Sequence, residues 1–331
     1  MTPSNPLRRL DRPSGQLTLG IDLPLDNDFT SVRRRGVPDL TRHAELAALA
    51  DRLGFAALWV RDVPVHDPVR FGDAGTVFET FTHLGHLAAT TSGAVLGTAA
   101  VALPLRNPLL VAKAAATVDV LSGGRFVLGL ASGDRPVEYP LFGVDFDRRD
   151  QIFRSAVDTL RAAWATPAPG AGIDAPELGV HPDLALDVLP KPVAGTVPLV
   201  VAGRARQSLD WIARHADGWF NYPRDATALA GQIAQWHAST DEVGTRKPYL
   251  MPMMLDLAED RTTGPSPIFH GLRLGGEAFL EHLGRLDELG VSHLSLSLRS
   301  STRPIDEVLH ELAETVLPQF PRLPVGASAA S

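Results

Sequence analysis

The stretch GTAAVALPLRNPLLVAKAAATVDVLSGGRFVLGLASGDRPVEYPLFGVDF, residues 97–146, decides the fold of this chain. The apolar run that leads into it, over 94–103, predicts a buried strand. Pro108 then opens a predicted helix over 109–121, since proline is favoured in the first turn of a helix. A second apolar run over 125–131 predicts another strand. Two strands joined by one helix through short connections lie parallel, so this stretch is a βαβ unit.

The same alternation of strand and helix runs through the rest of the 331-residue chain. The strands are mostly continuous apolar runs, which is typical of parallel strands covered on both faces. Eight such units predict an α/β protein with a single (β/α)8 TIM barrel, and a Pro-, Gly- and Asp-rich stretch over 166–197 predicts an insertion after strand four or five. A doubly wound open sheet is the alternative, although eight units fit barrel closure better. We expect one domain over 17–320, with flexible tails over 1–16 and 321–331.

The expected strands cover 17–25, 55–61, 94–103, 125–131, 197–202, 218–222, 249–257 and 291–298. The expected helices cover 79–91, 109–121, 147–164, 208–216, 226–240, 276–289 and 305–317, together with one that ends at residue 53 and is capped by Asp39 or Thr41.

Composition limits the classes of function. The chain has 31 Lys and Arg against 38 Asp and Glu, a net charge of −7, and no basic stripe, so we expect no nucleic-acid surface. Cysteine is absent, which excludes disulfides, thiolate metal sites and a cysteine nucleophile. No apolar run approaches about 18 residues, so we expect no membrane span. These features favour a cytoplasmic protein.

Several short motifs within residues 97–146 form a specific set. They are Gly97-Thr98-Ala99-Ala100, Leu103-Pro104, Asn107-Pro108, Asp119, Leu121-Ser122, Gly124-Arg125-Phe126, Gly129 and Phe142-Gly143. In this combination they resemble the bacterial-luciferase-type flavin monooxygenases, the luciferase-like family. The resemblance is weaker over 197–220 and extends over most of the chain.

This resemblance implies a flavin-dependent oxidoreductase. Members of the family use reduced FMN, which a partner flavin reductase supplies, together with oxygen to oxidise a small organic substrate. The cofactor carries the difficult chemistry and the protein orients it, which agrees with the lack of an obvious acid–base pair in this sequence. A deazaflavin-dependent hydride-transfer reductase on the same barrel is an alternative, and a catalytically silent flavin-binding protein is another.

The turn after the fifth predicted strand is the best candidate anion site. It carries Gly203, Arg204 and Gln207 at a place where TIM barrels build their active sites. Glycine lets a ligand approach the backbone, the following helix start offers N–H groups, and the arginine adds a fork of donors. In the family this turn holds the flavin phosphate, although a small hydroxyl residue often stands where Arg204 is here. A solvated helix start is the alternative.

Two further places are candidates for cofactor binding. After the fourth strand, Gly133 permits a tight turn, and Ser132 and Arg135 can donate to a phosphate or a ribityl chain. A plain connection is the alternative there. Ala99 and Ala100 match the position where members of the family carry a non-proline cis peptide beneath the flavin ring. Two small residues in a barrel strand are equally well explained by interior packing.

No catalytic acid or base is evident. In luciferases a histidine pair lies just after the second strand, and here that place is Asp62-Val63, with Val63 at the usual histidine position. The remaining candidates on the expected active face are Asp62, His66 and His270. Solvated loop histidines are the alternative for the last two.

Histidine spacing does not indicate a metal site. His83 and His86 are three residues apart on a predicted helix, which would place them on one face. Without a third ligand nearby we expect them to pack against neighbours, and we expect no bound metal.

We also expect a homodimer. The predicted helices over 79–91 and 109–121 carry more small apolar residues than one inward-facing stripe requires, which indicates a second covered face. The family resemblance favours the same assembly. The residues concerned are Phe81, Leu84, Leu87, Ala112, Ala115 and Ala116.

Overall fold

The computed structural model shows a closed barrel of parallel strands. It describes residues 5–11, 16–25, 40–67, 69–70, 78–165 and 172–322. The barrel strands are β1 (Thr18–Leu23), β2 (Ala57–Val60), β3 (Val95–Thr98), β5 (Phe126–Ala131), β6 (Leu199–Ala202), β7 (Gly218–Phe220), β8 (Tyr249–Leu257) and β11 (His293–Ser297). They are hydrogen-bonded in chain order, and β11 pairs with both β8 and β1, which closes the ring. The predicted TIM barrel is confirmed, because an open sheet would leave β1 and β11 unpaired.

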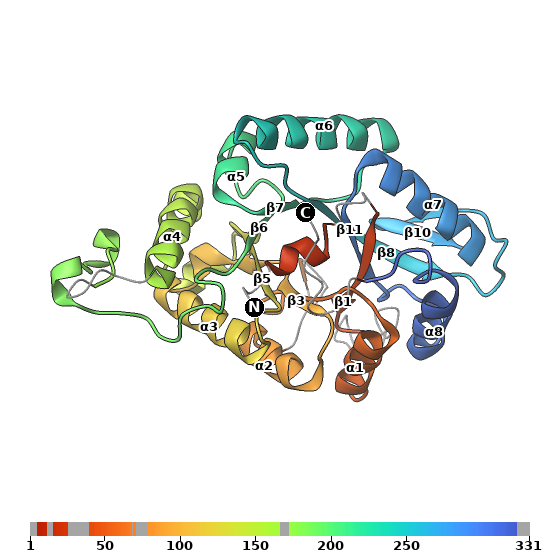
Figure 1. Ribbon diagram of the computed structural model, residues 1–331, viewed down its shortest axis with the longest axis horizontal. Helices are drawn as coiled ribbons and strands as arrows, with labels where there is room; N and C mark the ends of the chain where they lie inside the picture. The colour runs from red at the N-terminus through yellow and green to blue at the C-terminus, as the bar shows by residue number, and fades with distance from the viewer. Residues whose placement is uncertain are drawn as a thin grey trace.

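Helices alternate with these strands and surround them (Figure 1). They are α1 (His43–Leu53), α2 (Thr80–Thr90), α3 (Pro108–Leu121), α4 (Arg149–Trp164), α5 (Leu209–His215), α6 (Ala226–Glu242), α7 (Gly276–Leu289) and α8 (Ile305–Thr315). The expected cap at Thr41 is not formed, since the N-cap residue of α1 is Arg42, and Asp39 lies outside the described residues. Within the described part of the chain, no helix is long and apolar enough to cross a membrane.

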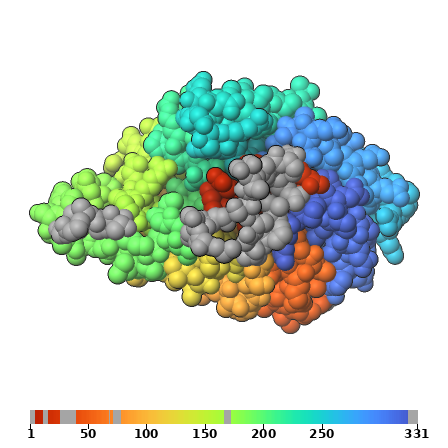
Figure 2. Space-filling model, in the orientation of Figure 1, coloured from red at the N-terminus to blue at the C-terminus, as the bar shows by residue number. Residues whose placement is uncertain are grey.

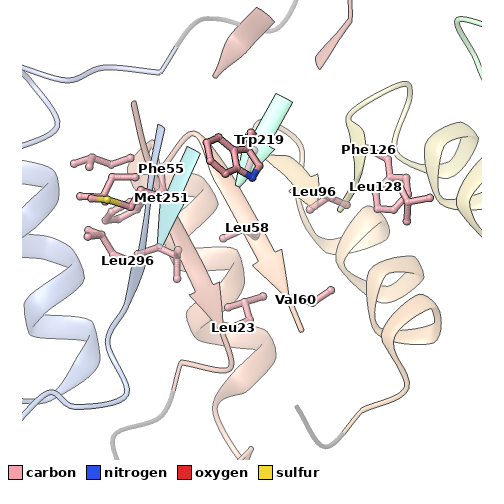
Figure 3. Packing of buried hydrophobic residues seen from close by; sticks show 14 of the residues in the cluster. Leu23, Phe55, Leu58, Val60, Leu96, Phe126, Leu128, Trp219, Met251 and Leu296 are labelled. Carbon is pink, nitrogen blue, oxygen red and sulfur yellow. The ribbon is translucent and has the colours of Figure 1, made fainter. Parts of the chain in front are cut away.

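The strands separate two hydrophobic cores, because successive residues of a strand point to opposite sides. On β11, Leu294 and Leu296 belong to the large core between the barrel and the helices. His293 instead lies inside the barrel, where Nε1 of Trp59 donates to it. Figure 3 shows part of the outer core, with side chains gathered between strands and helices.

Glycines make room for two large side chains inside the barrel. A Cβ on Gly97 would lie 2.3 Å from the ring of Trp59, and a Cβ on Gly20 would lie 2.7 Å from Nε2 of His293. Nε2 of His293 accepts from Trp59 at 2.9 Å, and its Nδ1 lies 2.8 Å from the hydroxyl of Thr18. Burial lowers the pKa of His293 to about 3, so this ring is neutral and carries its proton on Nδ1.

A 3-10 helix covers the N-terminal end of the barrel. This helix, η1 (Pro6–Arg9), lies across the opening in Figure 1. Leu7 in η1 and Leu10, the residue after η1, are buried in the hydrophobic cluster inside the barrel that includes Trp59. Residues 5–11, which lie in the expected tail over 1–16, close an apolar end of the barrel with these two leucines, and the bounds of the domain stay a prediction.

An ion pair holds the last described residues at the same end of the barrel. Arg322, in the expected tail over 321–331, lies 2.9 Å from Asp51. Asp51 also accepts from the backbone N–H groups of Gly93 and Ala94. Arg9 donates to the carbonyl of Gly93, so both ends of the described chain meet at this loop.

The expected insertion follows the fourth barrel strand, between α4 and β6. Its described part, from residue 172 onward, contains two 3-10 turns and projects from one side of the barrel in Figures 1 and 2. Nζ of Lys191 donates to the carbonyls of Ala163 and Ala165 at 2.9 and 2.8 Å, which fastens the insertion to the end of α4.

The strand expected over 94–103 is interrupted. β3 ends at Thr98, the Ala99–Ala100 peptide bond is cis, and the chain rejoins β5 through the two-residue strand β4 (Val101–Ala102). The non-proline cis peptide therefore lies at the position that the family resemblance implied.

A hairpin lies between β8 and α7, where no strand was expected. β9 (Ser266–Ile268) and β10 (Gly271–Leu274) pair antiparallel, and β10 also pairs in parallel with the second half of β8. The sequence did not indicate these strands because they are only three and four residues long and carry little strand periodicity of their own.

Apolar residues of α2 and α3 pack within the chain rather than on its surface. Of the six residues that suggested a second covered face, all except Phe81 are buried in the outer core, and Phe81 packs against that core. Packing of α2 against α3 explains them, so the homodimer stays a prediction. The exposed apolar residues of α3 are others, namely Leu110, Val120 and Leu121.

Candidate functional site

Strand alternation identifies, for each barrel strand, an inward-facing side chain near the C-terminal end of that strand. His293 points inward on β11, so Ser295 and Ser297 do too, and Ser297 is the last residue of that strand. The same step of two residues, starting from an inward residue of each strand, identifies the other members. We call this set the upper layer; it comprises Asp22, Arg61, Ala99, Ala131, Ala202, Tyr222, Met254 and Ser297.

The upper layer has an apolar half and a polar half. Its three alanines come from β3, β5 and β6, which are neighbours in the barrel. Asp22, Arg61 and Ser297 come from β1, β2 and β11, which are also neighbours. All three alanines are partly exposed, so the apolar half of the upper layer is accessible from outside the barrel.

Electrostatics show that several loops meet at Tyr222. Removal from water raises the pKa of its hydroxyl, Arg61 lowers that pKa, and Asp134 and Asp22 raise it further. Arg61 and Asp134 follow β2 and β5, and Asp22 lies near the end of β1. Tyr222 follows β7. The ends of four strands therefore converge at one place, as expected of a TIM-barrel active site.

Asp62, the first catalytic candidate, is held in an ion pair. Its two carboxylate oxygens accept from Nη2 and Nε of Arg106 at 2.6 and 2.9 Å. The hydroxyl of Thr80 donates to it at 3.0 Å, and the backbone N–H of Ala102 does so at 3.2 Å. These contacts join the loop after β2 to α2 and β4, just beyond Ala100. Asp62 therefore has the contacts expected of a residue that holds these segments of the chain together.

The turn after β5 is shaped by a buried tyrosine. The hydroxyl of Tyr139 donates to the carbonyl of Ser132, and a Cβ on Gly133 (φ +75°) would lie 2.9 Å from that hydroxyl. Tyr139 alone is therefore enough to require a glycine here. Arg135 lies 3.8 Å from Glu138, a carboxyl group that is 5% exposed and whose pKa is raised by burial. Sequence reasoning missed Glu138, since its spacing from Arg135 is that of an ordinary surface ion pair.

The turn after β6 presents backbone amides. Gly203, Ala205 and Arg206 have φ angles of 59°, 43° and 58°, in the left-handed region. Within the described part of the chain, the amides of 204–206 form no hydrogen bond. Successive amides in such a turn make a concave anion site. The exposed guanidinium of Arg204 lies 5.4 Å from the centre of the Trp219 ring.

The structure alters two expectations about the turn after β6. The side-chain amide of Gln207 is used within the fold, where it accepts from Arg154 and donates to the carbonyls of Asp150 and Ala205 at 3.1 and 3.0 Å. Helix α5 begins only at Leu209, and the hydroxyl of Ser208 caps it. The Ser208 hydroxyl thereby occupies the backbone N–H of Trp211, whereas the amides of 204–206 in the turn stay available to an anion.

The two candidate histidines lie in different surroundings. His66 is exposed on the loop after β2. His270 is in the tight turn between β9 and β10, with ring centroids 4.1 Å from Phe269 and 5.6 Å from Tyr222. Of the catalytic candidates Asp62, His66 and His270, His270 has a ring contact with the upper layer in the described structure, through Tyr222.

The sequence also led us to expect that His83 and His86 pack against neighbours. His83 is buried, with Nε2 2.6 Å from Nε2 of His43, and the ring of Phe78 packs against both. His86 is exposed on the same helix. Within the described residues, no group of three histidine or carboxylate side chains is arranged to hold a metal ion.

Comparison with known proteins places the chain in a family. Residues 19–255 match the model of the luciferase-like monooxygenase family. An uncharacterized protein of Mycobacterium tuberculosis is 34% identical over 198 residues, which cover 55% of this chain and 68% of that protein. The fold resembles a crystal structure of the monooxygenase RslO1 from Streptomyces bottropensis, with a TM-score of 0.75, 19% identity, and coverage of 92% of this chain and 100% of that one. It also resembles an F420-dependent secondary alcohol dehydrogenase, with a TM-score of 0.71, 17% identity, and coverage of 92% and 98%. The chain belongs to the luciferase-like monooxygenase family.

Proposed function

We propose that the chain is a flavin-dependent monooxygenase that uses reduced FMN and oxygen to oxidise a small organic substrate. A separate flavin reductase supplies the reduced FMN. One observation carries the proposal, namely that the apolar half of the upper layer lies beside the turn with amides 204–206. A planar ring with a phosphate tail matches an apolar surface next to an anion site.

The residues fit FMN in the following way. The turn amides and Arg204 hold the phosphate, Ser132 and Arg135 flank the ribityl chain, and Ala99 and Ala202 support the ring. Bound reduced FMN supplies the two electrons that activation of oxygen requires. The protein orients the ring and substrate and keeps water out, so no acid–base pair is needed.

Substitution of Arg204 tests this assignment. Arg204→Ala removes a charge-assisted donor, so we expect FMN to bind about 10–150-fold more weakly. Riboflavin lacks the phosphate, and its affinity should change much less. Fluorescence titration of both flavins against wild type and variant gives the comparison.

An exposed arginine on α5 provides the control for this experiment. Arg214→Ala makes the same charge change away from the turn, so FMN affinity should stay within about twofold of wild type. An equal loss of FMN and riboflavin affinity in Arg204→Ala would mean that Arg204 supports the fold only. No loss for either flavin would place the phosphate elsewhere.

A deazaflavin-dependent reductase is the second candidate. The observation that favours it is the similarity of this fold to an F420-dependent secondary alcohol dehydrogenase. Oxygen uptake with reduced FMN and bleaching of F420 in the presence of candidate alcohols separate the two enzymes. A monooxygenase consumes oxygen above the free-flavin rate, a reductase changes F420 absorbance, and a silent flavin binder does neither.

A further inference from the structure

Three neighbouring strands end in polar side chains that face the barrel interior. The register pairs Gly20 of β1 with Ser295 of β11, so Asp22 lies beside Ser297 two residues further on. On the other side, Asp22 pairs with Trp59 of β2, and Arg61 is the next inward residue of that strand. Neighbouring strands are about 4.8 Å apart. Arg61, Asp22 and Ser297 therefore form a row along the polar half of the upper layer.

The side chain of Ser297 is buried, at 5% exposed, and forms no hydrogen bond within the described part of the fold. Buried hydroxyl groups are normally hydrogen-bonded, so one without a partner at the mouth of a barrel indicates a ligand. Lower on the same strand, His293 faces the interior with both ring nitrogens used.

The row has a defined hydrogen-bonding pattern. Arg61 donates only, the Asp22 carboxylate accepts only, and the Ser297 hydroxyl can donate. The row therefore offers a donor, an acceptor and a donor in that order. A cyclic imide edge has the complementary pattern, because its N–H donor lies between two carbonyl acceptors. The isoalloxazine ring of FMN and the deazaflavin ring of F420 both carry this edge.

We propose that Arg61, Asp22 and Ser297 bind the imide edge of the cofactor ring. Asp22 accepts from the imide N–H, while Arg61 and Ser297 donate to the two carbonyl oxygens on either side. This inference rests on the proposed function, because it needs a flavin or deazaflavin ring on the alanine half of the layer. It assigns the polar half to the cofactor and leaves the side near Tyr222 and His270 to the substrate.

N3-methyl-FMN tests the inference without altering the protein. The methyl group replaces the imide hydrogen and keeps the phosphate and the rest of the ring. A hydrogen bond to a carboxylate should make wild type bind FMN about 10–150-fold more tightly than N3-methyl-FMN. In Asp22→Ala this preference should fall to about twofold or less. Equal affinity of wild type for the two flavins would overturn the inference.

Ser297 is tested by a matched pair of variants on one strand. Ser297→Ala should weaken FMN about 2–10-fold and leave the preference over N3-methyl-FMN intact. Ser297→Thr keeps the hydroxyl and should restore affinity. Ser295→Ala, on the same inner face but one layer deeper, should bind FMN as wild type does. Equal effects of Ser297→Ala and Ser295→Ala would remove Ser297 from the proposal.

Failure of this inference and of the proposed function can be told apart. If Arg204→Ala selectively weakens FMN but N3-methylation has no effect, the phosphate site stands and the imide row falls. If neither FMN nor F420 binds to wild type, both are overturned.

Discussion

Trp59 occupies the barrel interior because Gly97 on the neighbouring strand leaves space for its ring. The two residues are paired in register on β2 and β3, and both face inward. The indole is fully buried, donates to His293 and packs edge-on against Phe220 at 5.1 Å between ring centroids. The ring therefore has no direction in which to move away from an added methyl group.

Gly97→Ala should consequently destabilise the protein. A Cβ at 2.3 Å from the Trp59 ring overpacks the interior, which we expect to lower the free energy of unfolding by about 1–3 kcal/mol. Gly85→Ala is the control, since that glycine lies in α2 and a Cβ added there would have no atom within 4 Å. Better helix propensity should stabilise this variant by up to about 1 kcal/mol. Urea unfolding of both proteins gives the comparison, and equal stabilities would contradict the packing argument.

At the scale of elements, Asp62 joins three parts of the chain that are distant in sequence. It receives hydrogen bonds from Arg106 and Ala102 beyond the cis peptide and from Thr80 at the start of α2. The same arginine also reaches Glu79, the N-cap residue of that helix. This network fixes the loop after β2 relative to β4, which follows Ala99 of the upper layer.

Loss of the Asp62 network should affect stability and cofactor binding together. Asp62→Ala leaves the partly buried Arg106 without its main partner, and we expect a loss of about 3 kcal/mol in the free energy of unfolding, with weaker FMN binding. Glu45→Ala breaks an exposed ion pair with Arg42 and should leave the stability close to that of wild type. Thermal unfolding and FMN titration are the measurements. A variant of Asp62 with wild-type stability and FMN affinity but no turnover would show instead that Asp62 is catalytic.

At the scale of the whole molecule, buried neutral histidines make the fold sensitive to acid. Burial lowers the pKa of His43 to about 4 and those of His83 and His293 to about 3, against about 6.5 in an unfolded chain. Between these values the unfolded state binds more protons, so stability rises with pH. The contribution is complete above about pH 6.5 and is lost as the pH falls toward 3.

Urea unfolding at pH 8 and pH 5 measures this effect. His293 alone should lower the free energy of unfolding by about 2 kcal/mol at the lower pH, and the contact between His43 and His83 should add to that loss. The exposed His66 serves as control, since His66→Gln should leave the pH dependence unchanged. A stability that is constant between the two pH values would contradict the neutral state of these rings.

The local pattern of the sequence was enough for the barrel and for part of the candidate site. Apolar runs, proline starts and glycine stops are short-range signals, so they locate strands and helices such as β5 and α3. The turn at 203–207 was identifiable because glycine and arginine follow a buried strand. Ala99 and Ala100 were identifiable through the family resemblance, since nothing in an Ala-Ala pair by itself indicates a cis peptide.

Tertiary structure decided which side chains meet. The row of Arg61, Asp22 and Ser297 depends on the register between β1, β2 and β11, and the first and last barrel strands are some 270 residues apart in the chain. Asp62 and Gln207 are both used within the fold. Their partners, such as Arg106 for Asp62 and Arg154 for Gln207, come from other elements. Sequence periodicity reports which face of a strand is buried, but the pairing of distant strands sets which buried residues become neighbours.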